Sequence, residues 1–177
     1  GDKGTNNRTI TSEQLASIRQ KEQKEAVKTL GISKVEFLDF PDQGLEDTSE
    51  FREKIVRHIR IHKPEIVATV DPNRRYIRHR DHYITGRVVL DAVFPYARDY
   101  LAYPQHLREG IEPHKVTQVY LWGSEEPDKY IDITDTFEIK RNALHCHVSQ
   151  VGERTAEGDE RARDRYAALG NKVGVGL

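Results

Sequence analysis

The chain has 177 residues, of which 36% are hydrophobic and 32% charged, enough for one domain with a core of its own. Its 28 basic and 29 acidic residues leave a net charge of −1, so no global field indicates nucleic acid or an anionic membrane as a partner. No apolar run approaches the length of a membrane span, and no signal peptide is recognisable. The single cysteine, Cys146, excludes an internal disulfide framework and favours a reducing, cytoplasmic environment.

Hydrophobic spacing, together with glycine and proline positions, predicts alternating helices and strands. The first helix opens on a capping box at Thr11 and Gln14, and the second on another at Asp47 and Glu50. The run "EIVATV" is typical of a strand buried on both faces. In chain order we expect a helix over 11–30, a strand over 34–40, a helix from 47 to before Pro64, a strand over 65–70, a helix over 82–97, a strand over 115–122, a helix over 135–150 and a helix over 156–169.

This alternation predicts an α/β fold with layers of helices and a mostly parallel central sheet. In such sheets, ligands bind beyond the carboxyl ends of the strands. Polar clusters stand at such ends: Asp2 if a strand precedes it, Asp42 after 34–40, and 71–82 after 65–70. Three loops on one rim predict a pocket there. A generic nucleotide-binding fold is the weaker interpretation, because the sequence contains no G-x-G-x-x-G loop.

The stretch "RYIRHRDHYITG", residues 75–86, places His79 and His82 three apart with Asp81 between them. Neutral imidazoles are common zinc ligands, and a nearby carboxylate can fix their tautomer, so one interpretation is part of a metal site. The other is a polar loop in which Asp81 caps the following helix. A catalytic zinc needs about three protein ligands, so such a site also needs partners from elsewhere. The neighbouring arginines form either a rim for an anionic or sugar-phosphate substrate or a solvated loop; they are Arg74, Arg75, Arg78 and Arg80.

A second cluster, "ALHCHVSQ" over 143–150, also contains histidine and cysteine. Adjacent residues of a helix do not face one another, and no third group is evident to orient a base. Cys146 is therefore better interpreted as a small packed residue than as a nucleophile. His147 and Gln150 are three apart, which predicts that they share a helix face and line a pocket.

Several ordered segments carry a resemblance to a known family. They are "GDKGT", then Arg19 and Glu22, "LGISKVEFLDFPDQGL", "IRIHKPEIVATVDP", "HRDH", "EGIEPHKVTQVYLW", "DITDTFEIK" and "ALHCHVSQ". Together they resemble the LmbE-like, or PIG-L, family of zinc-dependent N-acetylglucosamine deacetylases. The resemblance covers residues 1 to about 150, and its specificity lies in the ordered set rather than in any single motif.

The resemblance implies a Rossmann-like three-layer α/β sandwich and a set of site residues. The family's His-Pro-Asp-His motif falls on residues 79–82, with arginine in place of proline. By this correspondence His82 would bind zinc, and His79 would act at the scissile carbonyl, as a stabiliser of the tetrahedral intermediate or in proton transfer. A substrate-binding arginine and aspartate of the family fall on Arg19 and Asp42.

The family's first motif, His-Pro-Asp-Asp, has no counterpart in these residues. It supplies two zinc ligands and the general base, and it lies upstream of the "GDKGT" segment in the family. We therefore expect 1–177 to be a single domain that is incomplete at its N-terminus and also at its C-terminus, and that is inactive as it stands.

The resemblance implies an N-deacetylase that uses Zn²⁺ or another divalent metal. Its substrate would be a small GlcNAc-containing molecule, and its products acetate and a free amine. The resemblance also allows for a homo-oligomer. Two alternatives stay open: an inactive sugar- or nucleotide-binding remnant of the same fold, and a zinc amidase that acts on a non-sugar acyl amide.

Overall fold

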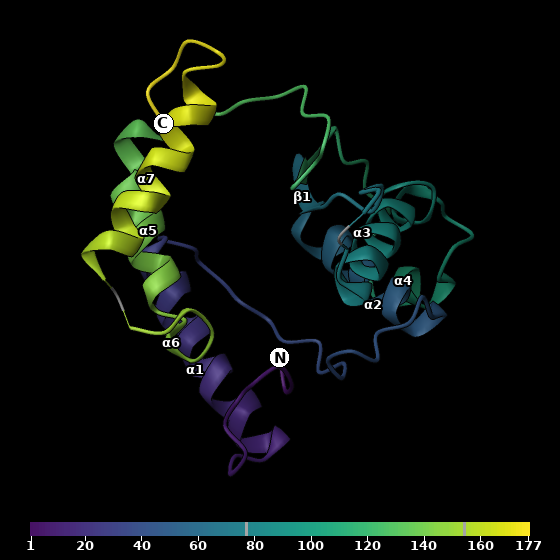
Figure 1. The fold of residues 1–177 in the computed structure, drawn as a ribbon. Coiled ribbons are helices and arrows are strands. Elements are labelled where there is room, and N and C mark those ends of the chain that lie inside the picture. Colours follow the sequence, from purple (N-terminus) through teal and green to yellow (C-terminus); the bar gives the residue numbers. More distant parts are fainter. Residues whose placement is uncertain (77, 154) are drawn as a thin grey trace. The chain divides into compact units, whose positions relative to one another are not determined.

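The computed structural model describes residues 1–76, 78–153 and 155–177, which form two compact units. The helical unit comprises Gly1–Phe37 and Asp128–Leu177, and the sheet unit comprises Leu38–Pro127 (Figure 1). Among the helices of the described residues, none is both long and apolar enough to cross a membrane.

The helical unit is built around packed helices. Its elements are α1 (Ser12–Thr29), η2 (Thr134–Thr136), α5 (Phe137–His145), α6 (Val148–Val151) and α7 (Ala156–Gly170). α1 packs against α5, and α5 contacts α7 through the T-shaped rings of Phe137 and Tyr166, whose centroids are 5.8 Å apart (Figure 1). The predicted capping box of α1 is confirmed, because the side chains of Thr11 and Gln14 each accept the other's backbone amide.

The helix predicted over 135–150 is interrupted in the structure. α5 ends at His145, and His147 leaves helical geometry with φ −88° and ψ 52° before α6 begins. Glu22 of α1 accepts hydrogen bonds from the backbone amide and the hydroxyl of Ser149, both at 2.7 Å. This carboxylate satisfies an amide that a continuous helix would bond internally, and the tertiary contact therefore accounts for the break.

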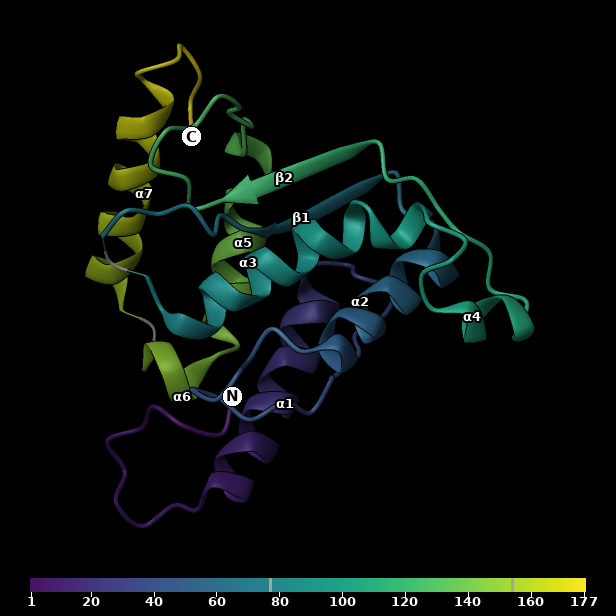
Figure 2. The same ribbon diagram turned by 90° about the vertical axis from the view of Figure 1, so that its right-hand side faces the viewer.

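The sheet unit combines a parallel strand pair with packed helices. Its elements are α2 (Ser49–His62), β1 (Ile66–Val70), α3 (Arg80–Val93), η1 (Tyr96–Arg98), α4 (Pro104–Arg108) and β2 (Gln118–Trp122). β1 and β2 run parallel, in a register that pairs Ile66 with Gln118 and Val70 with Trp122. α3 packs along β1, and α2 packs against α3 (Figure 2). The predicted α/β fold with a parallel sheet is thereby confirmed.

The core of the sheet unit lies where α2 meets α3. Two buried apolar clusters draw on both helices; their members are Val56, Ile59, Ala92, Ala97 and Val116 in one, and Leu45, Phe51 and Val88 in the other. Full burial of a side chain such as valine, isoleucine or phenylalanine contributes about 1.5–3 kcal/mol. The two clusters therefore fix α3, and with it the histidine motif at its N-terminus.

Three details of the predicted elements are wrong. No strand forms over 34–40 in the described chain, and Asp39 adopts a left-handed φ of 56° that interrupts the extended run. β1 is not buried on both faces, because Ile66 at its start is 45% exposed and only its carboxyl end is buried. Thr48, not Asp47, caps α2, since the Thr48 side chain accepts an amide hydrogen bond in the first helical turn.

Gly86 allows α3 to approach the end of β1 closely. A Cβ at this position would lie 2.5 Å from the carbonyl oxygen of Val70 and 3.0 Å from Cδ of Pro72. We expect Gly86→Ala to lower the free energy of unfolding, measured in urea, by about 1–3 kcal/mol or more. In the control variant Gly44→Ala, the new Cβ would meet Pro41 at an ordinary 3.5 Å. That variant should change stability by at most about 1 kcal/mol, and equal losses in the two variants would contradict the close approach.

A buried guanidinium holds the segment between α3 and α4. Arg60 of α2 is 1% exposed and donates to four backbone carbonyls at 2.7–3.1 Å, those of Tyr96, Ala97, Asp99 and Ala102. It also donates to Nδ1 of His106 at 3.3 Å. Because Nδ1 accepts, the proton of the neutral ring is on Nε2, which bonds the carboxylate of Glu53. One side chain therefore satisfies four carbonyls of an irregular segment in which Ala97 is the fully buried residue.

Candidate functional site

His79 is the N-cap of α3. Its Nδ1 accepts the backbone amide of Asp81 at 3.2 Å, and the first helical residue is Arg80. The alternative in which Asp81 caps this helix is therefore wrong. A ring nitrogen that accepts a hydrogen bond carries no proton, so the proton of neutral His79 is on Nε2. The cap thus leaves Nε2–H as a donor available to a ligand.

Asp81 ties the start of α3 to the loop that follows 34–40. Its carboxylate accepts the backbone amides of Gln43 at 2.6 Å and Leu45 at 3.4 Å. Burial raises the pKa of Asp81, but the hydrogen bonds from Gln43, from the Asp42 side chain and from Leu45 outweigh it, so the pKa is lowered overall. Asp81 therefore acts as a charged anchor between two loops.

The sheet unit brings Asp42 and His79 together, as the adjoining polar clusters predict. Asp42, His79 and Asp81 each offer a metal-ligating atom, and these atoms lie within 4.8 Å of one another. Asp81 and Nδ1 of His79 already bond backbone amides. Asp42 is half-buried beside them. Among the described residues, these three side chains thus form a cluster of possible metal ligands beside the start of α3.

His82 lies in the first turn of α3, beside His79. The two ring centroids are 5.1 Å apart, and the ring of Trp122 meets that of His82 edge-on at 5.9 Å. His82 is exposed, and its ring nitrogens make no hydrogen bond within the described part of the chain. An accessible neutral imidazole is a good ligand for zinc and similar ions, so His82 fits the metal role that the resemblance assigns to it.

Trp122 lies beside the histidine motif, although no sequence motif indicated it as a site residue. It ends β2, and the parallel register places it opposite Val70, the last residue of β1. The backbone amide of Asp71 donates to the Trp122 carbonyl at 3.0 Å. The available signal was its position at the carboxyl end of a strand, where α/β folds bind ligands.

The arginines around the histidine motif are largely engaged with neighbouring side chains. Arg75 pairs with Glu126, and Arg80 lies 3.8 Å from a carboxylate oxygen of Glu46. The guanidinium of Arg78 stacks over the ring of Tyr83 at 4.6 Å. These contacts favour the solvated-loop interpretation over an anion-attracting rim. Ile77, within the same stretch, lies outside the described residues.

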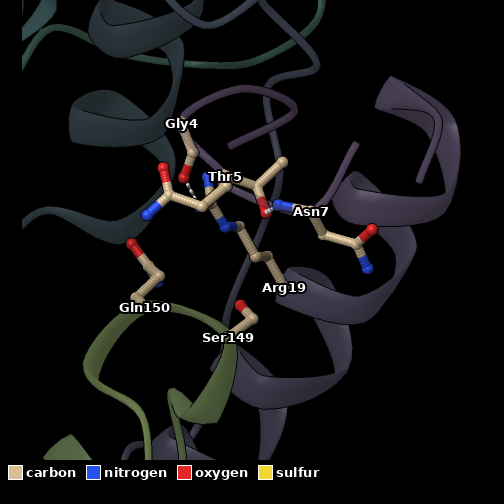
Figure 3. A pocket seen from close by; sticks show the side chains of 7 residues that line it. Gly4, Thr5, Asn7, Arg19, Ser149 and Gln150 are labelled. Atoms are coloured by element: carbon tan, nitrogen blue, oxygen red, sulfur yellow. Dashed lines mark hydrogen bonds between the residues drawn. The ribbon is translucent and has the colours of Figure 1, made fainter. Parts of the chain in front are cut away.

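The helical unit has a polar pocket of about 470 Å³. Its lining residues are Gly4, Thr5, Asn6, Asn7, Arg19, Ser149 and Gln150 (Figure 3). Arg19 donates to the backbone carbonyls of Gly1 at 3.2 Å and Gly4 at 2.8 Å, and to that of Lys3. Arg19 therefore shapes the N-terminal loop as well as the pocket. Gln150 lines this pocket as predicted, but His147 is not among the lining residues.

Removal of the Asp81 charge tests the anchor between the two loops. We expect Asp81→Asn to lower the free energy of unfolding by about 1 kcal/mol at neutral pH, because an amide cannot accept from both backbone N–H groups as well as a carboxylate does. Since the folded-state pKa is lowered, this contribution is complete above the unfolded pKa and is lost as the pH falls through the folded value.

The stability difference between Asp81→Asn and the native sequence should therefore shrink as the pH falls below about 5, through the unfolded-state pKa of an aspartate and then the lowered folded-state value. Urea unfolding curves across this range measure it. Asp91→Asn removes a carboxylate from the same helix without touching the loop over 42–45, and serves as the control. A difference that stays constant across the acid range would contradict the anchor.

Several known proteins are similar to this chain in amino-acid sequence. Residues 1–93 match the family described as PIG-L, GlcNAc-PI de-N-acetylase. The diacetylchitobiose deacetylase of Thermococcus kodakarensis is 33% identical over 157 residues, covering 86% of this chain and 57% of the relative. The mycothiol S-conjugate amidase of Streptomyces coelicolor is 32% identical over 189 residues, covering 78% of this chain and 64% of the relative. The chain thus spans somewhat under two thirds of the length of these relatives.

The fold is likewise similar to that of a solved deacetylase. The N,N'-diacetylchitobiose deacetylase of Pyrococcus horikoshii, solved with an inhibitor, superimposes with a TM-score of 0.89 at 27% identity. The match covers 100% of this chain and 67% of that structure. Together with the family match over more than half of its residues, this likeness shows that the chain belongs to the PIG-L, or GlcNAc-PI de-N-acetylase, family.

Proposed function

We propose that the protein hydrolyses the N-acetyl group of a small GlcNAc-containing substrate, giving acetate and a free amine. The observation that carries the proposal is the orientation of His79, whose ring proton is on Nε2, next to the accessible imidazole of His82. Amide hydrolysis needs a hydrogen-bond donor where the carbonyl oxygen gains negative charge. Family membership and the similarity to diacetylchitobiose deacetylases support the substrate class.

His82 would hold the metal, which we propose to be zinc or another divalent ion. When bound, such an ion lowers the pKa of a water molecule and polarises a carbonyl group. In members of the family that the chain resembles, a His-Pro-Asp-Asp motif without counterpart in residues 1–177 supplies the remaining ligands and the general base. We therefore assign to this chain only the ligand on α3, and propose the complete site for a protein that carries both motifs.

The described residues would bind the substrate and stabilise the negative charge that develops on its carbonyl oxygen. His79 donates its Nε2 proton in a hydrogen bond to the acetyl carbonyl oxygen as that oxygen becomes an oxyanion. Asp81 keeps the start of α3 fixed against its loop. Asp42, beside His79, would accept a hydrogen bond from a substrate hydroxyl. Arg19 is proposed to bind substrate as well, and its place in the lining of a polar pocket supports that role.

A second candidate is an amidase that removes an acyl group from a non-sugar amide. The similarity to a mycothiol S-conjugate amidase favours it, because that relative is named for cleaving a different conjugate. The same residues would serve, since the oxyanion and the metal are common to both reactions. Only the groups that bind the remainder of the substrate would differ.

A substrate panel distinguishes these functions. A protein that carries both motifs, supplied with zinc, is assayed for acetate and free amine from N-acetylglucosamine, diacetylchitobiose and GlcNAc conjugates, and in parallel for cleavage of N-acyl amino acids. We expect turnover of the GlcNAc compounds, loss of turnover with a chelator, and recovery when zinc is restored. Cleavage of the non-sugar amides alone would favour the amidase. Substrate binding with no turnover by the zinc-loaded protein would leave the inactive remnant and contradict both reactions.

A further inference from the structure

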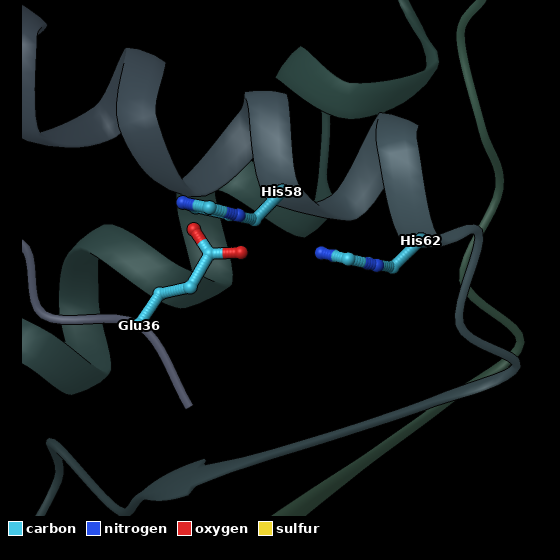
Figure 4. Close-up of side chains that lie close together, drawn as sticks. All are labelled: Glu36, His58 and His62. Carbon is cyan, nitrogen blue, oxygen red and sulfur yellow. The ribbon is translucent and has the colours of Figure 1, made fainter. Parts of the chain in front are cut away.

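Two histidines on α2 form a pair that the proposed reaction does not use. His58 and His62 are four residues apart, so their side chains lie one above the other on the same helix face (Figure 4). Their rings are stacked, with centroids 5.9 Å apart and planes within 3° of parallel. Their nearest ligand nitrogens lie within 4.8 Å of each other. Glu36, also drawn in Figure 4, belongs to the helical unit.

The separation of these rings suits a shared metal ion. Zinc–imidazole bonds are about 2.0–2.1 Å long, so two nitrogens on one ion lie no more than about 4.2 Å apart. Small rotations of the two side chains bridge the difference. The side chain of His62 is exposed, and that of His58 is half-buried. Histidines at i and i+4 are also the helical arrangement by which one face of a helix provides two ligands to a single ion.

The local charges allow a cation to approach. His62 is the last residue of α2, where the helix dipole carries partial negative charge and favours positive ions. Two cationic side chains on the preceding turns are each paired: Lys54 lies 3.2 Å from Glu50, and Arg57 lies 2.5 Å from Glu109. The helix end and these ion pairs therefore reduce the repulsion that a dication would meet at this face, where the exposed Lys63 follows His62.

We propose that His58 and His62 together bind one divalent transition-metal ion, of the kind that imidazole favours: zinc, nickel or copper. The bound ion joins the last two turns of α2, and so stabilises the C-terminal half of the helix that also carries Arg60. This site lies on a different helix from His79 and His82, and it holds or fails independently of the proposed deacetylase reaction.

Zinc binding to a set of variants tests the proposal. The starting protein carries His82→Ala, which removes the metal ligand proposed on α3; the group of Asp42, His79 and Asp81 is present in every variant alike. Zinc affinity is then measured by calorimetry, and the number of bound ions by native mass spectrometry. Into this background His58→Gln and His62→Gln are introduced separately, and His114→Gln is the control. His114 bonds the Pro64 carbonyl at 2.8 Å, a bond that glutamine can also donate.

Loss of either histidine of the pair should weaken zinc binding by at least about tenfold. Loss of groups that merely orient a metal ligand already costs about 10–100-fold in affinity, and loss of a ligand should cost no less. Zinc should also raise the Tm of the His82→Ala protein and of its His114→Gln control, and this rise should be smaller in both pair variants. In proton NMR spectra, zinc should shift the ring signals of two histidines together.

The result that would overturn the proposal is equal zinc affinity, and an equal rise in Tm, in the pair variants and the His114→Gln control. Metal-free unfolding curves that match those of the background protein show that the variants remain folded. None of these readouts depends on turnover, so an absence of deacetylase activity would leave the test of this site unaffected.

Discussion

Replacement of His79 with alanine is expected to lower kcat/KM for GlcNAc substrates by about 10²–10³-fold in a protein that carries both motifs. The alanine removes the Nε2 donor at the point where the carbonyl oxygen gains charge. It also removes the N-cap of α3, which costs about 1 kcal/mol of stability. Steady-state kinetics below the unfolding temperature separate the two effects, because the variant is then folded and only the chemical loss is measured.

His79→Asn is the matched control for the cap. Asparagine is a favoured N-cap residue, so its side chain can accept the Asp81 amide and keep the start of α3 in place. It lacks a donor at the position of Nε2. We expect His79→Asn to retain the stability of the native sequence and still lose most of the activity. Native activity in the alanine variant would show that His79 does not stabilise the oxyanion.

Replacement of Arg60 with leucine is expected to lower the free energy of unfolding by about 3–5 kcal/mol. Leucine fills much of the buried volume, but it leaves four backbone carbonyls and Nδ1 of His106 without their donor. Hydrophobic replacement of a buried ion pair can be harmless because both partners are removed. Here the partners are backbone groups that no substitution can remove, so their desolvation cost stays. Urea unfolding monitored by circular dichroism measures the loss.

Arg87→Leu makes the same chemical change at an exposed position of α3 and should alter stability by no more than about 0.5 kcal/mol. Arg60→Lys keeps the positive charge but not the fork of donors, and we expect a loss between those of the two leucine variants. If Arg60→Lys retained the full stability of the native sequence, charge alone would account for the role of Arg60, and the hydrogen-bonding argument would be wrong.

Much of the candidate site is predictable from short motifs, but its hydrogen bonding is not. The spacing of His79 and His82 marks them as a pair, and the strand predicted over 34–40, although it does not form, correctly suggested that Asp42 lies near them. The structure confirms that Asp42, His79 and Asp81 lie together. The sequence does not decide whether His79 or Asp81 caps α3, because both side chains offer a hydrogen-bond acceptor there. His79 caps α3 because the carboxylate of Asp81 instead accepts backbone amides of another loop.

The sequence by itself determined the helices with strong local signals and the α/β class. The capping box at Thr11 and the boundaries of α7 follow from contacts within about four residues, which any window of sequence contains. Only the tertiary structure decided that Asp81 bonds amides 36 and 38 residues away, and that Glu22 breaks a helix through Ser149, 127 residues along the chain. Such bonds depend on which loops the packed core brings together. A short window of sequence does not reveal that packing. The position of the proton on His79 and the anchoring of α3 therefore follow only from the folded structure.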